Sequence, residues 1–193
     1  PAAAGSPLIL DIDRLMIDQS LDLLARLPRD QNVAINVDAS CLGTSGLRHR
    51  IRSEAERLSL DPHRIELEVT EALLITAMAE VRDNMKDLDD FGVEWWVDNF
   101  GTGYSSITHL KDMPVTGLKL DRAFTSGVDQ GNDKALSLAQ GLAGLARGMG
   151  LHTTAEGIET TEQASILRAA GWEYGQGWLF GRPMPADQVT SRN

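Results

Sequence analysis

The chain alternates between short runs typical of β-strands and longer amphipathic runs typical of helices. Between the strand-like runs, apolar residues recur every three or four positions, as at Met78, Val81, Met85 and Leu88, which is the helical period. Strands and helices that alternate in this way form parallel sheets joined by helical crossovers. The pattern therefore predicts an α/β fold in a single domain, 1–193. Its predicted strands cover 33–37, 65–70, 94–98, 117–120, 152–156 and 174–179.

The expected helix ends carry recognisable capping residues. Gly92 follows the first periodic run, at the position where a glycine commonly ends a helix. Asp133 precedes a second apolar stripe over 135–145 and is the expected N-cap of that helix. Thr160 and Gln163 have the spacing of a capping box. These signals place a helix in each gap between the later strands.

The faces of the predicted strands favour a barrel over an open sheet. Leu67 and Val69 share one face of their strand, while Glu66 and Glu68 share the other. Central strands of a doubly wound sheet are buried on both faces and are continuously aliphatic. One apolar face under helices and one face that turns polar toward the strand end is typical of a (β/α) barrel. Because such barrels have about eight strands in about 250 residues, we expect a TIM-like barrel whose first two strands are missing from this chain.

Composition and charge exclude several classes of function. The 18 Lys and Arg residues against 28 Asp and Glu give a net charge of −10, which argues against a DNA- or RNA-binding protein. No apolar run approaches the ~20 residues of a transmembrane helix, so we expect no membrane segment in this chain. We expect the chain to lie in the cytoplasm or on the cytoplasmic side of a larger protein. The single cysteine, Cys41, excludes an internal disulfide and a cysteine-built zinc site.

Polar residues follow several predicted strands at the end where barrels carry their chemistry. If the carboxylates of Glu68, Asp98 and Glu156 lie together at one end of the barrel, they repel one another. Hard cations such as Mg²⁺ or Mn²⁺ between them would offset this repulsion. Asn36 offers a further oxygen ligand, and Lys119 offers a point charge for a phosphate oxygen or an attacking hydroxide. The combination favours metal-assisted phosphoester hydrolysis. The alternative is that each acidic residue is a helix cap or a solvated loop charge.

Six motifs resemble those of the EAL-domain family, the cyclic-di-GMP phosphodiesterases. Residues 98–106 read Asp-Asn-Phe-Gly-Thr-Gly-Tyr-Ser-Ser, where the family has Asp-Asp-Phe-Gly-Thr-Gly-Tyr-Ser-Ser. The other matching segments occur in the family's order and extend over essentially the whole chain. They are Asn36–Ser40, Glu68–Glu71, Leu118–Arg122, Ala155–Thr160 and Gln176–Pro183.

The resemblance implies an eight-stranded barrel that opens cyclic-di-GMP to the linear dinucleotide pGpG with one or two Mg²⁺ or Mn²⁺ ions. It also implies roles for individual positions, carried over motif by motif. Asn36, Glu68, Asp98 and Asn99 would be metal ligands, Lys119 would orient or activate the water, Glu156 would bind metal or act as base, Asp121 and Gln176 would line the catalytic pocket, and Glu71 and Glu159 would hold the loop after Asp98.

The chain departs from the family pattern in two places. Glu71-Ala72-Leu73 lies directly after Thr70 and lacks the Arg-Trp that follows the name-giving motif. In the family, that motif belongs to an earlier strand, upstream of this chain. Asn99 stands where the family has Asp, which removes one negative charge. We therefore expect the second metal site to be weak.

These departures leave two functions open. The first is a cyclic-di-GMP phosphodiesterase, active in the full-length parent, with residues 1–193 alone expected to be inactive. The second is a degenerate domain that acts as a non-catalytic cyclic-di-GMP receptor or signalling scaffold. In either case the resemblance implies cyclic-di-GMP as partner, a homodimer through the barrel face, and attached sensory or cyclase domains.

Overall fold

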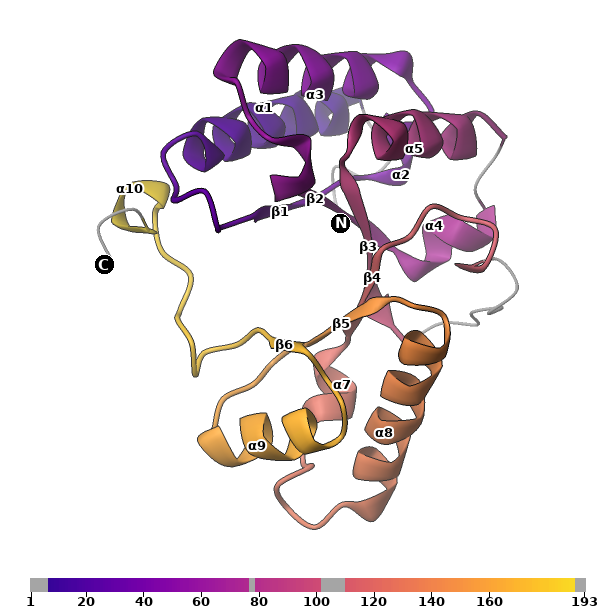
Figure 1. The fold of residues 1–193 in the computed structure, drawn as a ribbon, viewed down its shortest axis with the longest axis vertical. Coiled ribbons are helices and arrows are strands. Elements are labelled where there is room, and N and C mark those ends of the chain that lie inside the picture. Colours follow the sequence, from indigo (N-terminus) through magenta and orange to yellow (C-terminus); the bar gives the residue numbers. More distant parts are fainter. Residues whose placement is uncertain (1–6, 77–78, 102–109, 190–193) are drawn as a thin grey trace.

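The computed structural model describes residues 7–76, 79–101 and 110–189. Its six strands form one parallel sheet in the order β1-β2-β3-β4-β5-β6, so each strand pairs with the next one along the chain. The sheet curls, and helices cover its convex side (Figure 1). The strands are β1 (Val33–Asn36), β2 (Ile65–Thr70), β3 (Glu94–Phe100), β4 (Gly117–Leu120), β5 (His152–Ala155) and β6 (Tyr174–Gly175).

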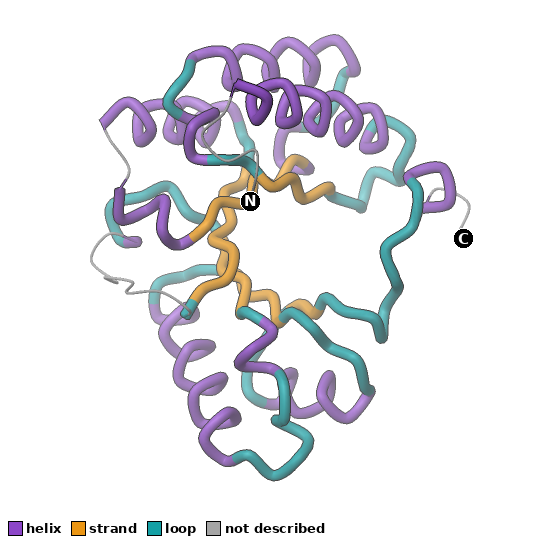
Figure 2. Tube along the Cα trace, turned by 180° about the vertical axis from the view of Figure 1, so that it is seen from behind, coloured by secondary structure: helices purple, strands orange, loops and turns teal. Residues whose placement is uncertain are grey.

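The helices connect successive strands along the outside of the curl. Figure 2 shows the strands as a curved inner wall with the helices around it. Among the described residues, β1 and β6 each pair along one side only, so this part of the chain is a partial barrel. The helices are α1 (Pro7–Leu24), α2 (Ala39–Leu42), α3 (Ser45–Leu58), the 3₁₀ turn η1 (Pro62–Arg64), α4 (Glu71–Thr76), α5 (Ala79–Phe91), α7 (Arg122–Thr125), α8 (Asp133–Gly148), α9 (Thr161–Ala169) and α10 (Ala186–Val189).

All six expected strands form, and the expected parallel topology is confirmed. The third strand continues two residues beyond the prediction, to Phe100. The sixth has only the residues Tyr174–Gly175. Two residues later, Gly177 lies so close to the backbone of Ile158 that any Cβ there would clash, a close approach that glycine allows.

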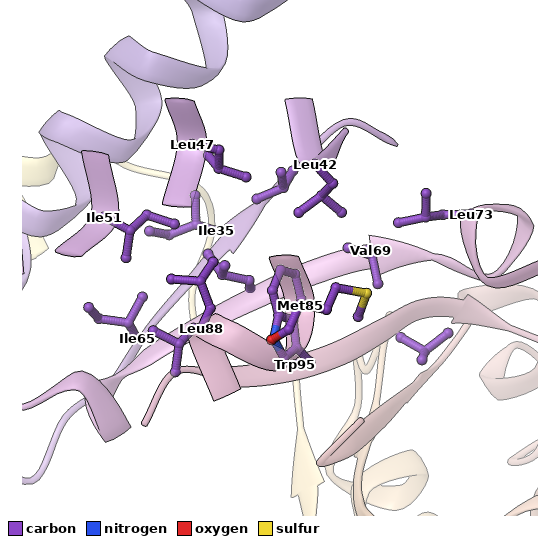
Figure 3. Packing of buried hydrophobic residues seen from close by; sticks show 14 of the residues in the cluster. Ile35, Leu42, Leu47, Ile51, Ile65, Val69, Leu73, Met85, Leu88 and Trp95 are labelled. Carbon is purple, nitrogen blue, oxygen red and sulfur yellow. The ribbon is translucent and has the colours of Figure 1, made fainter. Parts of the chain in front are cut away.

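The main core lies between the convex side of the sheet and the helices around β1 to β3. Trp95 is fully buried there, and its indole Nε1 donates a hydrogen bond to the backbone oxygen of Met85, 3.0 Å away. Figure 3 shows Met85 and Leu88 of α5 beside Trp95, with Ile51 of α3 nearby. Trp96, the next residue of the strand, faces the inside of the curl. In β3 the two faces thus alternate as predicted, with Trp95 under the helices and Trp96 on the inner face.

The helix caps confirm most of the sequence reading. Gly92 has φ +109 directly after α5, and Thr160 with Gln163 forms the complete capping box at α9. One detail is wrong: the N-cap of α8 is Asn132, whose side chain accepts a hydrogen bond from the backbone N–H of Ala135, and Asp133 is the first helical residue. Both residue types cap well, so the pattern left the boundary ambiguous by one position.

The buried face of α8 also differs from the expected leucine stripe. Leu138 is 45% exposed, whereas Ala139, Ala143 and Ala146 are buried. Short alanine side chains face the core, and Leu142 packs beside them as a partly buried residue. The sequence pattern gave more weight to leucine than to alanine because leucine is more hydrophobic. It therefore did not identify the alanine face of α8 as the buried one.

Within the described residues, no helix is both long and apolar enough to cross a bilayer.

Candidate functional site

Lys119 lies at the centre of the inner face of the curled sheet. Its Nζ donates a hydrogen bond to Oε1 of Glu68 over 2.7 Å and lies 2.6 Å from Oε1 of Glu156. Glu68 comes from β2, Lys119 from β4, and Glu156 directly follows β5. Lys119 and Glu68 are each only 5% exposed. The three charges therefore form a compact group that is largely withdrawn from solvent.

The environment changes the acidity of all three groups. Burial raises the pKa of Glu68, the charge of Asp98 raises it further, and Lys119 opposes both effects. The pKa of Glu156 is raised for the same reasons, by burial first and then by Asp98 and Glu68. Burial alone would lower the pKa of Lys119, but the charges and hydrogen bonds of Glu68 and Glu156 raise it overall. Lys119 is therefore a firmly held cation beside two carboxylates that accept protons more readily than usual.

Asp98 and Asn99 occupy an irregularity in β3. The register of β3 with β4 shifts between Val97 and Phe100, and Asn99 has φ +56, a left-handed conformation that Asn adopts more readily than most residues. The backbone N–H of Asn99 donates to Oδ1 of Asp98 over 2.8 Å, and its Nδ2 donates to Oδ2 over 2.9 Å. The Asn99 side chain thus supplies a hydrogen-bond donor to the Asp98 carboxylate.

Glu71 links the end of β2 to the segment that follows β3. It is the first residue of α4 and is buried, and its Oε2 accepts a hydrogen bond from the backbone N–H of Gly101, 3.0 Å away. Gly101 has φ +96 and lies just before 102–109, which is outside the described residues. Glu159 has a different partner: its Oε1 accepts a hydrogen bond from Arg122 over 2.7 Å. The described partners of Glu71 and Glu159 therefore differ, and the expectation that both hold the loop after Asp98 stays a prediction because 102–109 lies outside the described residues.

The remaining expected site residues lie around the charged group. Asn36 ends β1 as an exposed residue and is in register with Glu68. Asp121 caps α7 by accepting from the backbone N–H of Ala123 over 2.7 Å. Gln176 is exposed, and its backbone N–H donates to Ala155 over 2.8 Å. Gln176 and Glu156 line one cavity of about 780 Å³.

Several residues near the site carried no signal in the sequence. The hydroxyl of Thr125 is fully buried on α7 and donates a hydrogen bond to the backbone oxygen of Glu156. Arg182 and Trp178 line the cavity shared by Glu156 and Gln176, and the Arg182 guanidinium lies 4.5 Å from the Trp178 ring centroid. Arg182 and Trp178 lie inside a recognised motif, which could have pointed to them. Nothing in the spacing of Thr125 reveals its contact.

The donor chemistry at this end of the sheet fits a hard divalent cation. Glu68, Asp98 and Glu156 supply carboxylate oxygens and Asn36 a carbonyl oxygen, which are the ligands that Mg²⁺ and Mn²⁺ prefer. The charge of Asp98 raises the pKa of both Glu68 and Glu156, and this crowding of negative charge is what a cation would neutralise. In the described part of the chain, no three acidic, His or Cys side chains converge as a preformed metal group. Lys119 instead supplies the positive charge between Glu68 and Glu156.

The chain is similar to curated bacterial signalling proteins over nearly its full length. It is 36% identical to the bifunctional diguanylate cyclase/cyclic di-GMP phosphodiesterase MucR of Pseudomonas aeruginosa, with 99% of this chain covered. It is 31% identical to the cyclic di-GMP phosphodiesterase PdeL of Escherichia coli, again with 99% covered. The chain spans 28% of the length of MucR and 54% of the length of PdeL, so it corresponds to one part of each protein.

Solved structures show the same architecture. The PaMucR phosphodiesterase in complex with c-di-GMP superposes with a TM-score of 0.90 at 33% identity, covering 98% of this chain and 78% of that one. The manganese/cy-diGMP complex of Klebsiella pneumoniae BlrP1 has a TM-score of 0.84 at 25% identity, covering 94% and 47%. These matches confirm the TIM-like fold. The family model described as "EAL domain" matches residues 1–183, and the chain therefore belongs to the EAL domain family.

Proposed function

We propose that this chain is the catalytic part of a cyclic-di-GMP phosphodiesterase that hydrolyses the cyclic dinucleotide to linear pGpG. The observation that carries the proposal is the Lys119 ammonium held between the carboxylates of Glu68 and Glu156 at the polar end of the curled sheet. MucR and PdeL are named cyclic di-GMP phosphodiesterases, and the PaMucR structure contains c-di-GMP. These similarities support the choice of substrate.

In this proposal the scissile phosphodiester lies over Lys119. The ammonium group stabilises negative charge that develops on the phosphoryl oxygens, and its raised pKa keeps it protonated through the reaction. Glu156 accepts the proton of the attacking water at Oε2, since its Oε1 faces Lys119. A raised pKa makes this carboxylate a better general base near neutral pH than an ordinary glutamate. The water oxygen bonds to phosphorus as the P–O bond to the 3′ oxygen breaks, the 3′ oxygen takes up a proton from solvent and leaves as a hydroxyl, and the ring opens with a 5′ phosphate.

A divalent cation would be held by the oxygens of Asn36, Glu68, Asp98 and Glu156. When bound, it supplies Lewis-acid polarisation of a phosphoryl oxygen. BlrP1 was solved with manganese and cy-diGMP, which supports a divalent ion in this family. Asp121 and Gln176 would line the pocket around the substrate, and Gln176 borders the same cavity as Glu156.

One observation favours the second candidate function, a receptor that binds cyclic-di-GMP without cleaving it. The Asn99 amide donates to Oδ2 of Asp98, so this position offers a donor where a second cation would need an acceptor. A receptor would retain the cavity beside Glu156 and lose only turnover. Homodimerisation and attached sensory or cyclase domains stay predictions; MucR, named as a bifunctional enzyme, supports the latter.

Product analysis separates the two functions. The full-length product of the gene, and residues 1–193 alone, are incubated with cyclic-di-GMP and Mn²⁺, and the nucleotides are separated by chromatography. Linear dinucleotide that accumulates with turnover, and disappears in Glu156→Ala, supports the phosphodiesterase. Intact cyclic-di-GMP that co-elutes with the full-length protein supports the receptor and contradicts the proposed activity. We expect no turnover from residues 1–193 alone.

A further inference from the structure

Asp13 is a charged residue buried in the outer layer of the fold. It belongs to α1, which packs against β1 on the convex side of the sheet (Figure 1). Asp13 is only 8% exposed, and acidic side chains are rarely buried to this degree without a hydrogen-bond donor. The donor here is the backbone N–H of Asp38, which lies 3.1 Å from Oδ2 of Asp13. Asp13 therefore ties a helix to the segment directly after β1.

The segment that Asp13 holds carries Asn36, the last residue of β1 and an expected cation ligand. Asn36 is in register with Glu68 of β2. The next residue, Val37, is buried, and its backbone N–H donates to the backbone oxygen of Glu68 over 2.9 Å. The N–H of Asp38 then donates to Asp13. Two successive backbone N–H groups after Asn36 thus have fixed partners, one in the sheet and one in α1.

This end of β1 depends on contacts outside the sheet. Within the described residues, β1 pairs only with β2, so the sheet holds the strand along one side. The chain then turns into α2, where the backbone oxygen of Asp38 accepts a hydrogen bond from the N–H of Cys41 over 3.0 Å. A rotation of the Asp38 peptide would turn the backbone that carries Asn36. The contact with Asp13 opposes that rotation, and supporting contacts of this kind commonly change metal affinity by about ten- to a hundredfold.

We propose that Asp13 is a positioning residue of the divalent-cation site and acts through the backbone that carries Asn36. The inference rests on the proposed function, because that function assigns Asn36 as a cation ligand. Asp13 lies on the convex side and acts without touching the cation or the substrate. Its carboxylate accepts the N–H of Asp38 and thereby fixes the direction of the Asn36 amide before a cation binds.

Isothermal titration of the full-length protein with Mn²⁺, without nucleotide, tests this role. Asp13→Ala removes the acceptor and should weaken Mn²⁺ binding by about tenfold. Asp13→Asn keeps an oxygen acceptor for the N–H of Asp38 but removes the charge, so its Mn²⁺ affinity should stay within about twofold of the wild type. Asp18→Ala is the matched control, because Asp18 is another aspartate of α1 and pairs with Arg50 of α3 over 2.6 Å. It should leave Mn²⁺ affinity unchanged.

A double-mutant cycle separates positioning from a general loosening of the fold. If Asp13 acts through Asn36, Asp13→Ala should change Mn²⁺ affinity little in an Asn36→Ala background. Asp13→Ser supplies the same comparison if Asp13→Ala does not fold. Its shorter side chain gives up the contact with Asp38, and its hydroxyl can bond a backbone oxygen of its own helix. Melting temperatures without metal, measured on every variant, report the purely structural effect.

Three results would overturn the inference. The first is equal Mn²⁺ affinity in the wild type and Asp13→Ala, whatever their melting temperatures. The second is an equal loss in Asp13→Asn and Asp13→Ala, which would show an effect of charge. The third is a full, additive loss in the Asn36→Ala background.

The proposed function fails separately from this inference. A wild type that binds Mn²⁺ but leaves cyclic-di-GMP intact removes the proposed hydrolysis, while weaker Mn²⁺ binding by Asp13→Ala would still support the positioning role. A wild type that cleaves cyclic-di-GMP, with Mn²⁺ affinity unchanged in Asp13→Ala, removes only the positioning role. A wild type that binds no Mn²⁺ removes both.

Discussion

Lys119 and Glu68 form a buried ion pair of 2.7 Å across an intervening strand, because Lys119 is on β4 and Glu68 on β2 with β3 between them. The curl of the sheet brings these two inner-face side chains together over the polar end of β3. Glu156 completes the group from the end of β5. The ion pair thus depends on the curvature of the sheet and also holds two of its strands in relation to each other.

Removal of the central cation should damage both folding and activity. Lys119→Met leaves the carboxylates of Glu68 and Glu156 without their shared partner, so we expect a loss of about 3 kcal/mol in the free energy of unfolding. Turnover of cyclic-di-GMP should fall at least about a hundredfold. Urea titration and product chromatography measure the two effects. Lys111→Met, at an exposed lysine, is the control, and a similar loss in both variants would contradict the account.

Much of this architecture could be predicted from the sequence. The strand alternation around Leu67 and Val69 identified the buried face, and the polar residues at the strand ends identified Glu68, Lys119 and Glu156. What could not be predicted depends on tertiary distances. No one-dimensional pattern shows that one ammonium group bridges two carboxylates, or that the Thr125 hydroxyl on a four-residue helix reaches the backbone of Glu156.

The Asn99 position should control divalent-cation affinity. Asn99→Asp replaces the donor to Oδ2 of Asp98 with a second carboxylate, which should tighten Mn²⁺ binding by about tenfold. In the absence of metal, the added repulsion should lower the melting temperature. Isothermal titration with Mn²⁺ measures the affinity. The double variant Asp98→Asn with Asn99→Asp has the same net charge as the wild type, so it separates the effect of the added charge from the effect of its position. Equal Mn²⁺ affinity in the wild type and in Asn99→Asp would contradict the hypothesis.

Thr125 should act on catalysis through the position of Glu156. Thr125→Val keeps the shape but removes the hydroxyl that donates to the Glu156 carbonyl. We expect unfolding free energy to fall by about 1–3 kcal/mol and kcat to fall while KM changes little. Thr125→Ser keeps the donor and should recover most of kcat. If Ser and Val variants are equally impaired, the hydroxyl has no such role.

A half-buried glutamate of β2, Glu66, should give stability a distinct pH dependence. Burial raises the pKa of Glu66, and the charge of Glu94 raises it further, while the hydrogen bond from Asn32 opposes them. Since the folded protein binds this proton more tightly than the unfolded chain, stability should decrease as pH rises from the ordinary glutamate pKa through the raised one. Glu66→Gln should remove the contribution of Glu66 to that decrease, leaving the contributions of Glu68 and Glu156, and should stabilise the protein at neutral pH.

Urea titration at pH values between about 4 and 8 measures the free energy of unfolding over a range that includes the ordinary glutamate pKa. These measurements test the expectation. Glu56→Gln, on the exposed side of α3, is the matched control and should keep the wild-type slope. An unchanged slope in Glu66→Gln would contradict the assignment.

Gly117 should tolerate no side chain. A Cβ at this position would overlap the Trp96 indole, which lies over the Gly117 backbone on the inner face. Gly117→Ala should therefore cost about 1–3 kcal/mol of stability. Gly144→Ala is the opposite control, because a Cβ there meets nothing within 4 Å and should stabilise α8 by about 0.5–1 kcal/mol. Thermal unfolding of both variants compares them; equal melting temperatures would contradict the packing described.

The central claim is that the group formed by Lys119, Glu68 and Glu156 cleaves a phosphodiester. Its most direct test is the turnover of cyclic-di-GMP at saturating Mn²⁺ by the full-length protein and by Glu156→Gln, with ligand binding measured in parallel. The account predicts linear dinucleotide from the wild type, at least about a hundredfold lower kcat in the variant, and similar affinity in both. Equal turnover by Glu156→Gln, or binding by the wild type without cleavage, would contradict it.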